Sequence, residues 1–240
     1  MRIQRYKHDS ECSYTLGATL TYEMLKCTPE LVNRVFFRSS LKTSAGIDQI
    51  IEMCEKHKIQ LITSDKIFNI MSPKGNCFVI GEFYKKESEL QNANHIVLVG
   101  PADAGNLGTI LRTATGFGFR DIAIIRPAVD VFDPKTVRAS MGAIFHLNVK
   151  YFDTIEEYCD RFPNNARYAF MLKASKVMKD VVIRRPFSLI LGNEATGLPN
   201  YFADFCDTVI IKHTRDIDSL NLTIAAGIAM YEFTKKEFAN

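Results

Sequence analysis

The sequence lacks the patterns that mark several large classes of protein. None of its apolar runs approaches the length that a membrane span needs, and its first residues lack the apolar core of a secretory signal. We therefore expect neither membrane insertion nor export. Its 240 residues also contain no internal repeat and no low-complexity tract. This length suits one large domain or two modest ones with a well-buried core.

Cysteine and histidine are present but not clustered. The six cysteines and five histidines are scattered along the chain, without a Cys-x-x-Cys pair or a histidine at metal-ligand spacing. Disulfide frameworks and zinc sites require such clustering. The sequence therefore predicts free thiols in a reducing cytoplasm and no bound metal.

Glycine patterns of the common nucleotide sites are missing as well. Gly116 and Gly118 follow an expected helix instead of opening one, so the G-x-G-x-x-G fingerprint of dinucleotide-binding enzymes is absent. No phosphate loop, Ser-His-Asp set or Cys-His pair appears. An oxidoreductase with a dinucleotide cofactor remains compatible with the alternation of helices and strands, but not with these absences.

The charge of the chain permits a nucleic-acid partner without requiring one. The formal net charge is +3, and the estimated pI is about 8.5. Dedicated nucleic-acid binders are usually more basic. Because the charges are spread evenly along the sequence, a basic patch would have to form by folding or by dimerisation.

Hydrophobic periodicity predicts two α/β regions. In the first, we expect helices at residues 16–27, 45–58 and 66–71, and strands at 32–38, 59–63 and 77–83. The polar, aperiodic stretch around residues 84–94 is the best linker candidate. In the second, we expect strands at 96–99, 122–125, 147–151, 168–172, 188–191 and 208–211, and helices at 107–115, 135–144, 155–160 and 220–235.

The apolar, β-branched strands of the second region predict a parallel sheet covered on both faces. Ligands of such sheets collect in the loops that follow the carboxyl ends of the strands. Three of these loops carry polar side chains that suit a binding site.

The first two loops each have a structural and a functional interpretation. Asn106 and Arg112 follow the strand at 96–99, where they form either a helix cap with a solvent-facing arginine or part of a site. In the second loop, Gly192 and Gly197 bracket Glu194. Glycine permits close approach of a ligand to the backbone, whereas Glu194 alone could simply balance a helix dipole.

The third loop leads into the last helix. We expect Ser219 or Asp218 to cap this helix, because both can accept hydrogen bonds from its free N–H groups. The helix is apolar nearly all round and is therefore expected to be buried. Asn221 is then a poor helix former placed one turn into a buried helix, where its amide needs partners.

Taken together, the three loops resemble a known set of motifs. The segments Asn-x-Gly-x-x-x-Arg-Thr-Ala (106–114), Leu-Gly-Asn-Glu-x-x-Gly-Leu (191–198) and Ser-Leu-Asn (219–221) look like the three motifs of the SpoU/TrmH class of SPOUT RNA methyltransferases. Their order, spacing and strand context agree over roughly residues 92–236. Residues 138–143 resemble a further segment that is common in these proteins.

The resemblance implies an α/β fold with a C-terminal SPOUT α/β knot. This is a deep trefoil knot in a mostly parallel sheet, an exception to the usual absence of knots, and a small α/β substrate-binding domain precedes it. We accordingly expect an RNA substrate-binding domain at residues 1–86, a linker at 87–94 and a SpoU-type methyltransferase domain at 95–240. A homodimer is also implied.

The activity implied is transfer of a methyl group from S-adenosylmethionine to a ribose 2′-hydroxyl, in ribosomal RNA rather than tRNA. Matching positions that carry the catalytic roles are Asn106, Arg112, Glu194, Ser219 and Asn221. Matching positions that contact the cofactor are Leu172, Gly192, Asn193, Ile211 and Leu220. The alternative is a non-catalytic RNA-binding protein on the same scaffold.

One loop of this chain departs from the family pattern, and the role usually given to the family's arginine is difficult to explain chemically. Where relatives often have Pro-Met and a small loop, this chain has Lys212-His213-Thr214-Arg215. That loop either shapes the cofactor site differently or is simply solvated. In addition, a guanidinium is effectively always protonated, so we expect Arg112 to clamp a phosphate and stabilise developing alkoxide charge instead of acting as a base.

Overall fold

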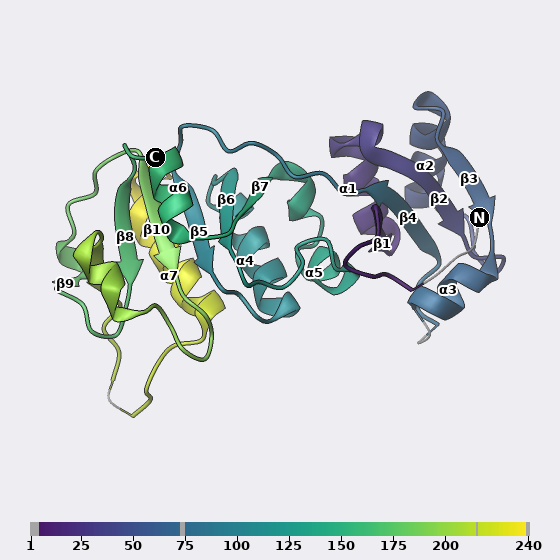
Figure 1. Cartoon of the computed structure of the whole chain (residues 1–240). Coiled ribbons are helices and arrows are strands. Elements are labelled where there is room, and N and C mark those ends of the chain that lie inside the picture. The colour runs from purple at the N-terminus through teal and green to yellow at the C-terminus, as the bar shows by residue number, and fades with distance from the viewer. Residues whose placement is uncertain (1–4, 73–74, 215, 239–240) are drawn as a thin grey trace. The chain divides into compact units, whose positions relative to one another are not determined.

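The computed structural model describes residues 5–72, 75–214 and 216–238 (Figure 1). By its packing the chain forms two compact units: the first runs to Lys86 and also contains Asp130–His146, whereas the second consists of Glu87–Val129 and the residues from Leu147 onward. Among the described residues, every helix is too short or too polar to traverse a lipid bilayer.

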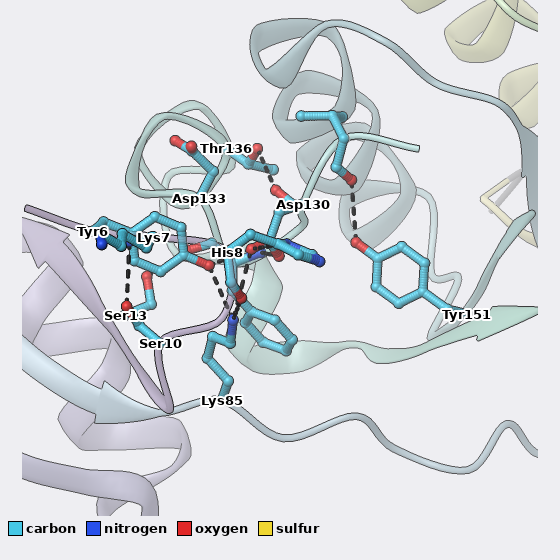
Figure 2. Close-up of polar contacts among 12 residues, drawn as sticks. Tyr6, Lys7, His8, Ser10, Ser13, Lys85, Asp130, Asp133, Thr136 and Tyr151 are labelled. Atoms are coloured by element: carbon cyan, nitrogen blue, oxygen red, sulfur yellow. Dashed lines mark hydrogen bonds and ion pairs between the residues drawn. The ribbon is translucent and has the colours of Figure 1, made fainter. Parts of the chain in front are cut away.

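The segment Asp130–His146 belongs to the first unit, although the sequence places it inside the expected methyltransferase domain. Its contacts with the N-terminal region explain the difference. The Asp130 carboxylate accepts a hydrogen bond from the Tyr6 hydroxyl and lies 2.9 Å from His8 Nδ1 and 3.7 Å from Lys85 Nζ (Figure 2). Contacts between residues this far apart in the sequence leave no local pattern, so periodicity alone could not place the segment.

The first unit alternates strands and helices, as its hydrophobic pattern predicts. In chain order its elements are β1 (Cys12–Leu16), α1 (Ala18–Cys27), η1 (Pro29–Leu31), β2 (Val32–Phe37), α2 (Ala45–Lys56), β3 (Gln60–Thr63), α3 (Asp65–Met71), β4 (Val79–Tyr84), α5 (Pro134–Ala139) and η2 (Ala143–His146). Within the described residues its sheet has the order β1-β4-β2-β3, and only the β2–β3 pair is parallel.

Strand β1 was not predicted, because the sequence pattern indicates only a helix that begins at residue 16. Its inward-facing residues are Ser13 and Thr15, which are fully buried although they are polar. Thr15 Oγ1 lies 2.8 Å from Thr21 Oγ1 and accepts a hydrogen bond of 3.0 Å from the Gly81 backbone N–H. Because buried hydroxyl groups have hydrogen-bond partners here, the strand can bury polar residues. Its sequence therefore lacks the alternation of apolar and polar residues by which a strand is recognised.

The helix that the sequence predicts over residues 135–144 is divided in the structure. Helix α5 is followed by Met141 and Gly142, which have φ values of 51° and 90°, and then by η2. Two successive residues in the left-handed region end a right-handed helix. The periodic apolar pattern continues across the break, so this boundary was predicted wrongly.

The second unit holds the parallel sheet that the sequence predicts. Its elements are β5 (His95–Val99), α4 (Ala104–Gly116), β6 (Asp121–Ile125), β7 (Asn148–Phe152), α6 (Ile155–Arg161), β8 (Ala166–Phe170), β9 (Lys176–Val177), η3 (Met178–Asp180), β10 (Phe187–Leu191), η4 (Asn200–Asp204), β11 (Asp207–Ile210), α7 (Leu222–Thr234) and η5 (Lys235–Glu237). The short β9 was not predicted.

The strand order of this unit determines which loops meet. In the part of the chain that the structure describes, the sheet runs β7-β6-β5-β10-β8-β11-β9, with every neighbouring pair parallel. Strand β10 inserts between β5 and β8, so the loops after β5, β10, β8 and β11 leave the same edge of the sheet (Figure 1). The predicted polar positions lie in or next to these loops. The trefoil knot itself stays a prediction.

Candidate functional site

The loop between β5 and α4 is organised by a helix cap. The Asp103 side chain accepts a hydrogen bond of 2.7 Å from the Asn106 backbone N–H and is the N-cap of α4. Asn106 is therefore inside the first turn, and its interpretation as the cap is wrong. This frees its side-chain amide, which donates a hydrogen bond of 3.2 Å to Glu194 Oε1.

The loop that follows β10, residues 191–198, is here called the Gly192 loop. Asn193 Nδ2 donates to the Gly100 carbonyl at 2.7 Å, and its Oδ1 accepts from the Ala195 N–H at 2.9 Å. The Gly197 N–H also donates to the Asn193 carbonyl at 2.9 Å. Asn193 thus closes the loop on itself and links it to the loop that follows β5.

Gly192 is required by the tight folding of this loop. A Cβ added there would lie 2.5 Å from both the Gly197 oxygen and the Leu198 nitrogen, far inside van der Waals contact. Since both atoms belong to the backbone, neither can move without opening the loop. The backbone that approaches Gly192 so closely is that of its own loop, and the approach of a ligand to Gly192 stays a prediction. Gly197 has the positive φ of 66° that favours glycine.

Glu194 connects the Gly192 loop to the start of α4. Its carboxylate accepts hydrogen bonds from the backbone N–H groups of Ala102 at 3.0 Å and Asp103 at 3.3 Å, in addition to that from Asn106. Burial by itself raises the pKa of this carboxyl, but the hydrogen bonds outweigh burial and hold the pKa below its usual value. Glu194 is therefore a charged tether between two loops.

The segment between β11 and α7, residues 211–221, is here called the His213 loop. Asn221 caps α7: its Oδ1 accepts from the Thr223 N–H at 2.8 Å and from the Thr223 hydroxyl at 2.6 Å. Ser219 and Asp218 are exposed and do not cap the helix. The sequence-based cap is wrong by two or three residues, and Asn221 is an exposed cap instead of a buried amide.

A cavity of about 340 Å³ lies at this edge of the sheet. It is lined by the ends of β8, β10 and β11, by the Gly192 and His213 loops, and by the first turn of α7. Among the predicted positions, those that line it are Leu172, Gly192, Asn193, Glu194, Ile211, Ser219 and Leu220. A cavity of this size, with apolar walls and a few polar groups, is typical of small-molecule sites.

Three predicted site residues do not line the cavity. Asn106 reaches it through Glu194, and Asn221 adjoins Leu220 and Leu222, which do line it. Arg112 is exposed on α4 and makes no hydrogen bond or ion pair with any described residue. Its guanidinium is therefore available to a partner from solution.

Met171 and His213 are among the cavity-lining residues that the sequence did not assign to the site. Met171 precedes Leu172, and His213 belongs to the polar run that departs from the family pattern. The His213 ring lies 2.9 Å from the Ile211 carbonyl through Nδ1 and is half-buried, whereas Lys212 and Thr214 are exposed. Arg215 lies outside the described residues. The interpretation as a solvated loop holds for Lys212 and Thr214 and fails for His213.

The cavity fits the cofactor that the resemblance implies. S-adenosylmethionine combines a flat apolar ring, a charged amino-acid end and a sulfonium centre. Leu191, Leu198 and Leu220 provide apolar surface, and the crowded Gly192 brings bare backbone to the wall. The carboxylate of Glu194 supplies negative charge at one side. No rearrangement is required for these groups to reach a ligand, because they already line the space.

The chain matches a known protein family and resembles solved structures. Residues 93–231 match the SpoU rRNA Methylase family. The chain is similar over its length to the crystal structure of an AdoMet-bound rRNA methyltransferase from Sinorhizobium meliloti, with a TM-score of 0.80 and 25% identity. That match covers 94% of this chain and 88% of the other.

Two relatives match a little over half of this chain. A tRNA/rRNA methyltransferase of Synechocystis, slr1673, described as uncharacterized, is 30% identical over 147 residues, which cover 60% of this chain and 54% of that protein. A 23S rRNA (uridine(2479)-2′-O)-methyltransferase of Streptomyces viridochromogenes is 31% identical over 147 residues, covering 58% of this chain and 51% of that protein. The matches thus span about half the length of each relative.

Proposed function

Because this chain belongs to the SpoU rRNA methylase family, we propose that it uses S-adenosylmethionine to methylate a ribose 2′-hydroxyl of RNA. One observation supports this proposal most directly. The cavity at the strand ends is bordered by the crowded Gly192, and Glu194 joins it to Asn106 of the first motif. Residues of the second and third motifs thus line one cofactor-sized space, and the first motif is hydrogen-bonded to the second.

The cofactor is held in this proposal by backbone and apolar groups. Gly192, Ile211 and Leu220 would supply these contacts from the cavity wall, and Leu172, which is 57% exposed, would add apolar surface. Asn193 keeps the Gly192 loop closed. When bound, S-adenosylmethionine supplies an electrophilic methyl group on a sulfonium leaving group. No metal is required for a displacement of this kind.

The remaining polar residues position the RNA. Arg112 would bind the phosphate next to the target ribose and stabilise the negative charge that develops on the 2′-oxygen as its proton is lost to water. Asn106 and Glu194 hold the start of α4 in place for this task. Ser219 and Asn221 orient the ribose from the start of α7. Such alignment of reacting groups contributes much of the rate enhancement.

A homodimer forms part of the proposal. Helix α7 has a single charged residue, Glu232, and exposes about half of the Ile224 and Tyr231 side chains. The Tyr231 ring lies 6.2 Å from that of Phe117, at the end of α4. An apolar patch of this kind is typical of a subunit interface.

Sedimentation tests this interface. The native chain should sediment as a dimer and the Tyr231→Glu variant as a monomer; equal masses would contradict the interface.

The RNA is proposed to be ribosomal, and the first unit is proposed to bind it in the cytoplasm. The relative from Streptomyces is named for action on 23S rRNA, and folded RNA is recognised by shape and by unstacked bases, which suits a separate binding unit. The residues that contact the RNA cannot be identified from the sequence by a simple motif.

The decisive experiment is transfer of labelled methyl from S-adenosylmethionine to total RNA, separated into ribosomal RNA and tRNA, followed by mapping of the methylated nucleotide. Label at a 2′-oxygen of ribosomal RNA supports the whole proposal, and label in tRNA corrects its substrate. Cofactor binding without label in any RNA would instead favour the non-catalytic RNA-binding alternative.

Arg112→Ala supplies the matched inactive variant. We expect turnover to fall by roughly 10²–10³-fold, as for removal of one group that stabilises transition-state charge. Cofactor affinity should stay within about twofold of the native value in calorimetry, since Arg112 does not line the cavity. Loss of cofactor binding in a folded Arg112→Ala chain would contradict this role.

A further inference from the structure

Three side chains that can bind metals meet in the first unit. Glu23 and Cys27 lie on α1, and His146 is the last residue of η2. His146 Nε2 lies 3.3 Å from Cys27 Sγ and 3.3 Å from Glu23 Oε2, and Cys27 Sγ lies 4.0 Å from Glu23 Oε2. Both elements belong to the same compact unit.

These separations match one face of a tetrahedral zinc site. With Zn–S of about 2.3 Å, Zn–N and Zn–O of about 2.0–2.2 Å and angles of about 109°, ligand atoms lie about 3.3–3.6 Å apart. Two of the three separations fall at 3.3 Å, and the third, from Cys27 Sγ to Glu23 Oε2, is 4.0 Å. Only a small rotation of the Glu23 side chain is needed to complete the triangle.

The fold brings the ligands together through a close backbone approach. Glu23 and Cys27 are four residues apart on α1 and therefore lie on one face of the helix. Opposite them, Gly142 has a φ of 90°, and a Cβ at this position would lie 2.9 Å from the Glu23 Cβ. Because glycine permits this contact, the turn before η2 can approach α1 and direct His146 at the two ligands.

We propose that Glu23, Cys27 and His146 bind one Zn²⁺ ion, with water as its fourth ligand. Sulfur, imidazole nitrogen and carboxylate oxygen together suit zinc, whereas Mg²⁺ and Ca²⁺ prefer oxygen ligands alone. The Glu23 and His146 side chains are 28% and 37% exposed, so an ion can enter and the fourth position faces solvent. The ion connects α1 with the end of the Asp130–His146 segment and stabilises that packing.

The absence of a metal motif from the sequence does not argue against this site. Cys27 and His146 are separated by 119 positions, so no local spacing relates them. The three residues are not part of the cofactor cavity, because none of them lines it.

Cobalt binding to the 240-residue chain tests the proposal. After treatment with a chelator, Co²⁺ titration should give the visible bands of a tetrahedral site and a thiolate-to-cobalt charge-transfer band, saturating at one ion per chain and bleached by Zn²⁺. Cys27→Ser should abolish the charge-transfer band, and both Cys27→Ser and His146→Asn should weaken zinc binding by at least about tenfold.

Matched controls separate this site from unspecific binding. Cys12 is another half-buried thiol of the same unit and His57 another exposed imidazole, so Cys12→Ser and His57→Asn should bind zinc as the native chain does. Zinc should raise the melting temperature of the native chain and both controls, but not of the site variants. Glu23→Gln, which preserves size, repeats the test if another variant fails to fold.

Two results would overturn the inference. The first is a native chain without a thiolate-to-cobalt band, which would reduce the cluster to an ion pair beside a thiol. The second is zinc affinity that Cys27→Ser, His146→Asn and Glu23→Gln all leave unchanged.

Discussion

The Gly192 loop and the His213 loop both line the cavity, but they are built differently. In the Gly192 loop, Asn193 and Glu194 make a dense set of hydrogen bonds to backbone groups, within the loop and in the segment that follows β5. In the His213 loop, the described side chains at 212, 214 and 216–220 make no hydrogen bond to another described residue, and most of them are exposed. The Gly192 loop is thus a preorganised wall of the cavity, whereas the His213 loop is a wall with few internal restraints.

This difference explains where the sequence can depart from its relatives. A backbone held by many hydrogen bonds and a crowded glycine accepts few substitutions. A loop with few contacts accepts many, and Lys212-His213-Thr214-Arg215 is where this chain departs from the family pattern. We infer that the Gly192 loop sets the shape of the site, and that the His213 loop adjusts its affinity.

Gly192→Ala should have the largest effect on this comparison. The added methyl group would collide with backbone atoms of Gly197 and Leu198, so we expect unfolding free energy to fall by roughly 3 kcal/mol and cofactor binding to be lost. Urea unfolding and calorimetry with S-adenosylmethionine measure the two effects. Gly116→Ala is the control, because a Cβ there meets nothing within 4 Å. Equal stability of the two variants would contradict our inference that the Gly192 loop is a preorganised wall of the cavity.

Glu194→Gln should have the next largest effect. The amide keeps one acceptor oxygen but turns an NH2 group toward backbone donors, so we expect a loss of about 1–3 kcal/mol at neutral pH, measured by urea unfolding. The folded-state pKa of Glu194 is lowered. Its stabilisation is therefore complete above the unfolded-state pKa and is lost as pH falls through the lower folded-state value.

The native chain and Glu194→Gln should accordingly converge in stability in acid, at pH values below the ordinary glutamate range. Glu156→Gln, an exposed position on α6, should behave like the native chain throughout. A difference between native and Glu194→Gln chains that persists unchanged in acid would show that charge is not what the tether supplies.

Asn221→Ala tests the firmest point of the His213 loop. Loss of the cap should cost about 1 kcal/mol of unfolding free energy. Asn221→Asp keeps the capping oxygen and should restore stability. Turnover per folded molecule then decides the role: a loss in Asn221→Asp supports an orienting amide, and full activity leaves Asn221 as a cap alone.

The smallest effect is expected inside the His213 loop. His213→Ala should weaken S-adenosylmethionine binding several-fold, because this side chain lines the cavity. Lys212→Ala should leave the affinity unchanged, because Lys212 is exposed and does not line it. Calorimetry of both variants is sufficient. A larger loss in Lys212→Ala than in His213→Ala would reverse our view of this loop.

Local patterns predicted most of the secondary structure but not its boundaries. Apolar periodicity places the helices and most strands within a few residues. It fails at β1, where buried hydroxyl groups of Ser13 and Thr15 find partners, and at Met141–Gly142, where positive φ values interrupt an apolar pattern. It also fails at the helix caps. Asp103 and Asn221 are the N-caps, although neighbouring polar residues are equally suited to this role by residue type.

The amino-acid sequence alone was sufficient for the α/β class, the parallel sheet and the family, since these depend on short-range periodicity and on motifs that each lie within one loop. It was also sufficient to single out Gly192 and Glu194. Folding was needed to join Glu194 to Asn106, to place His213 in the cavity and to leave Arg112 outside it. The same holds for Asp130–His146 and for the meeting of Cys27 with His146. Such contacts connect residues that are close only in space, and local sequence carries no record of them.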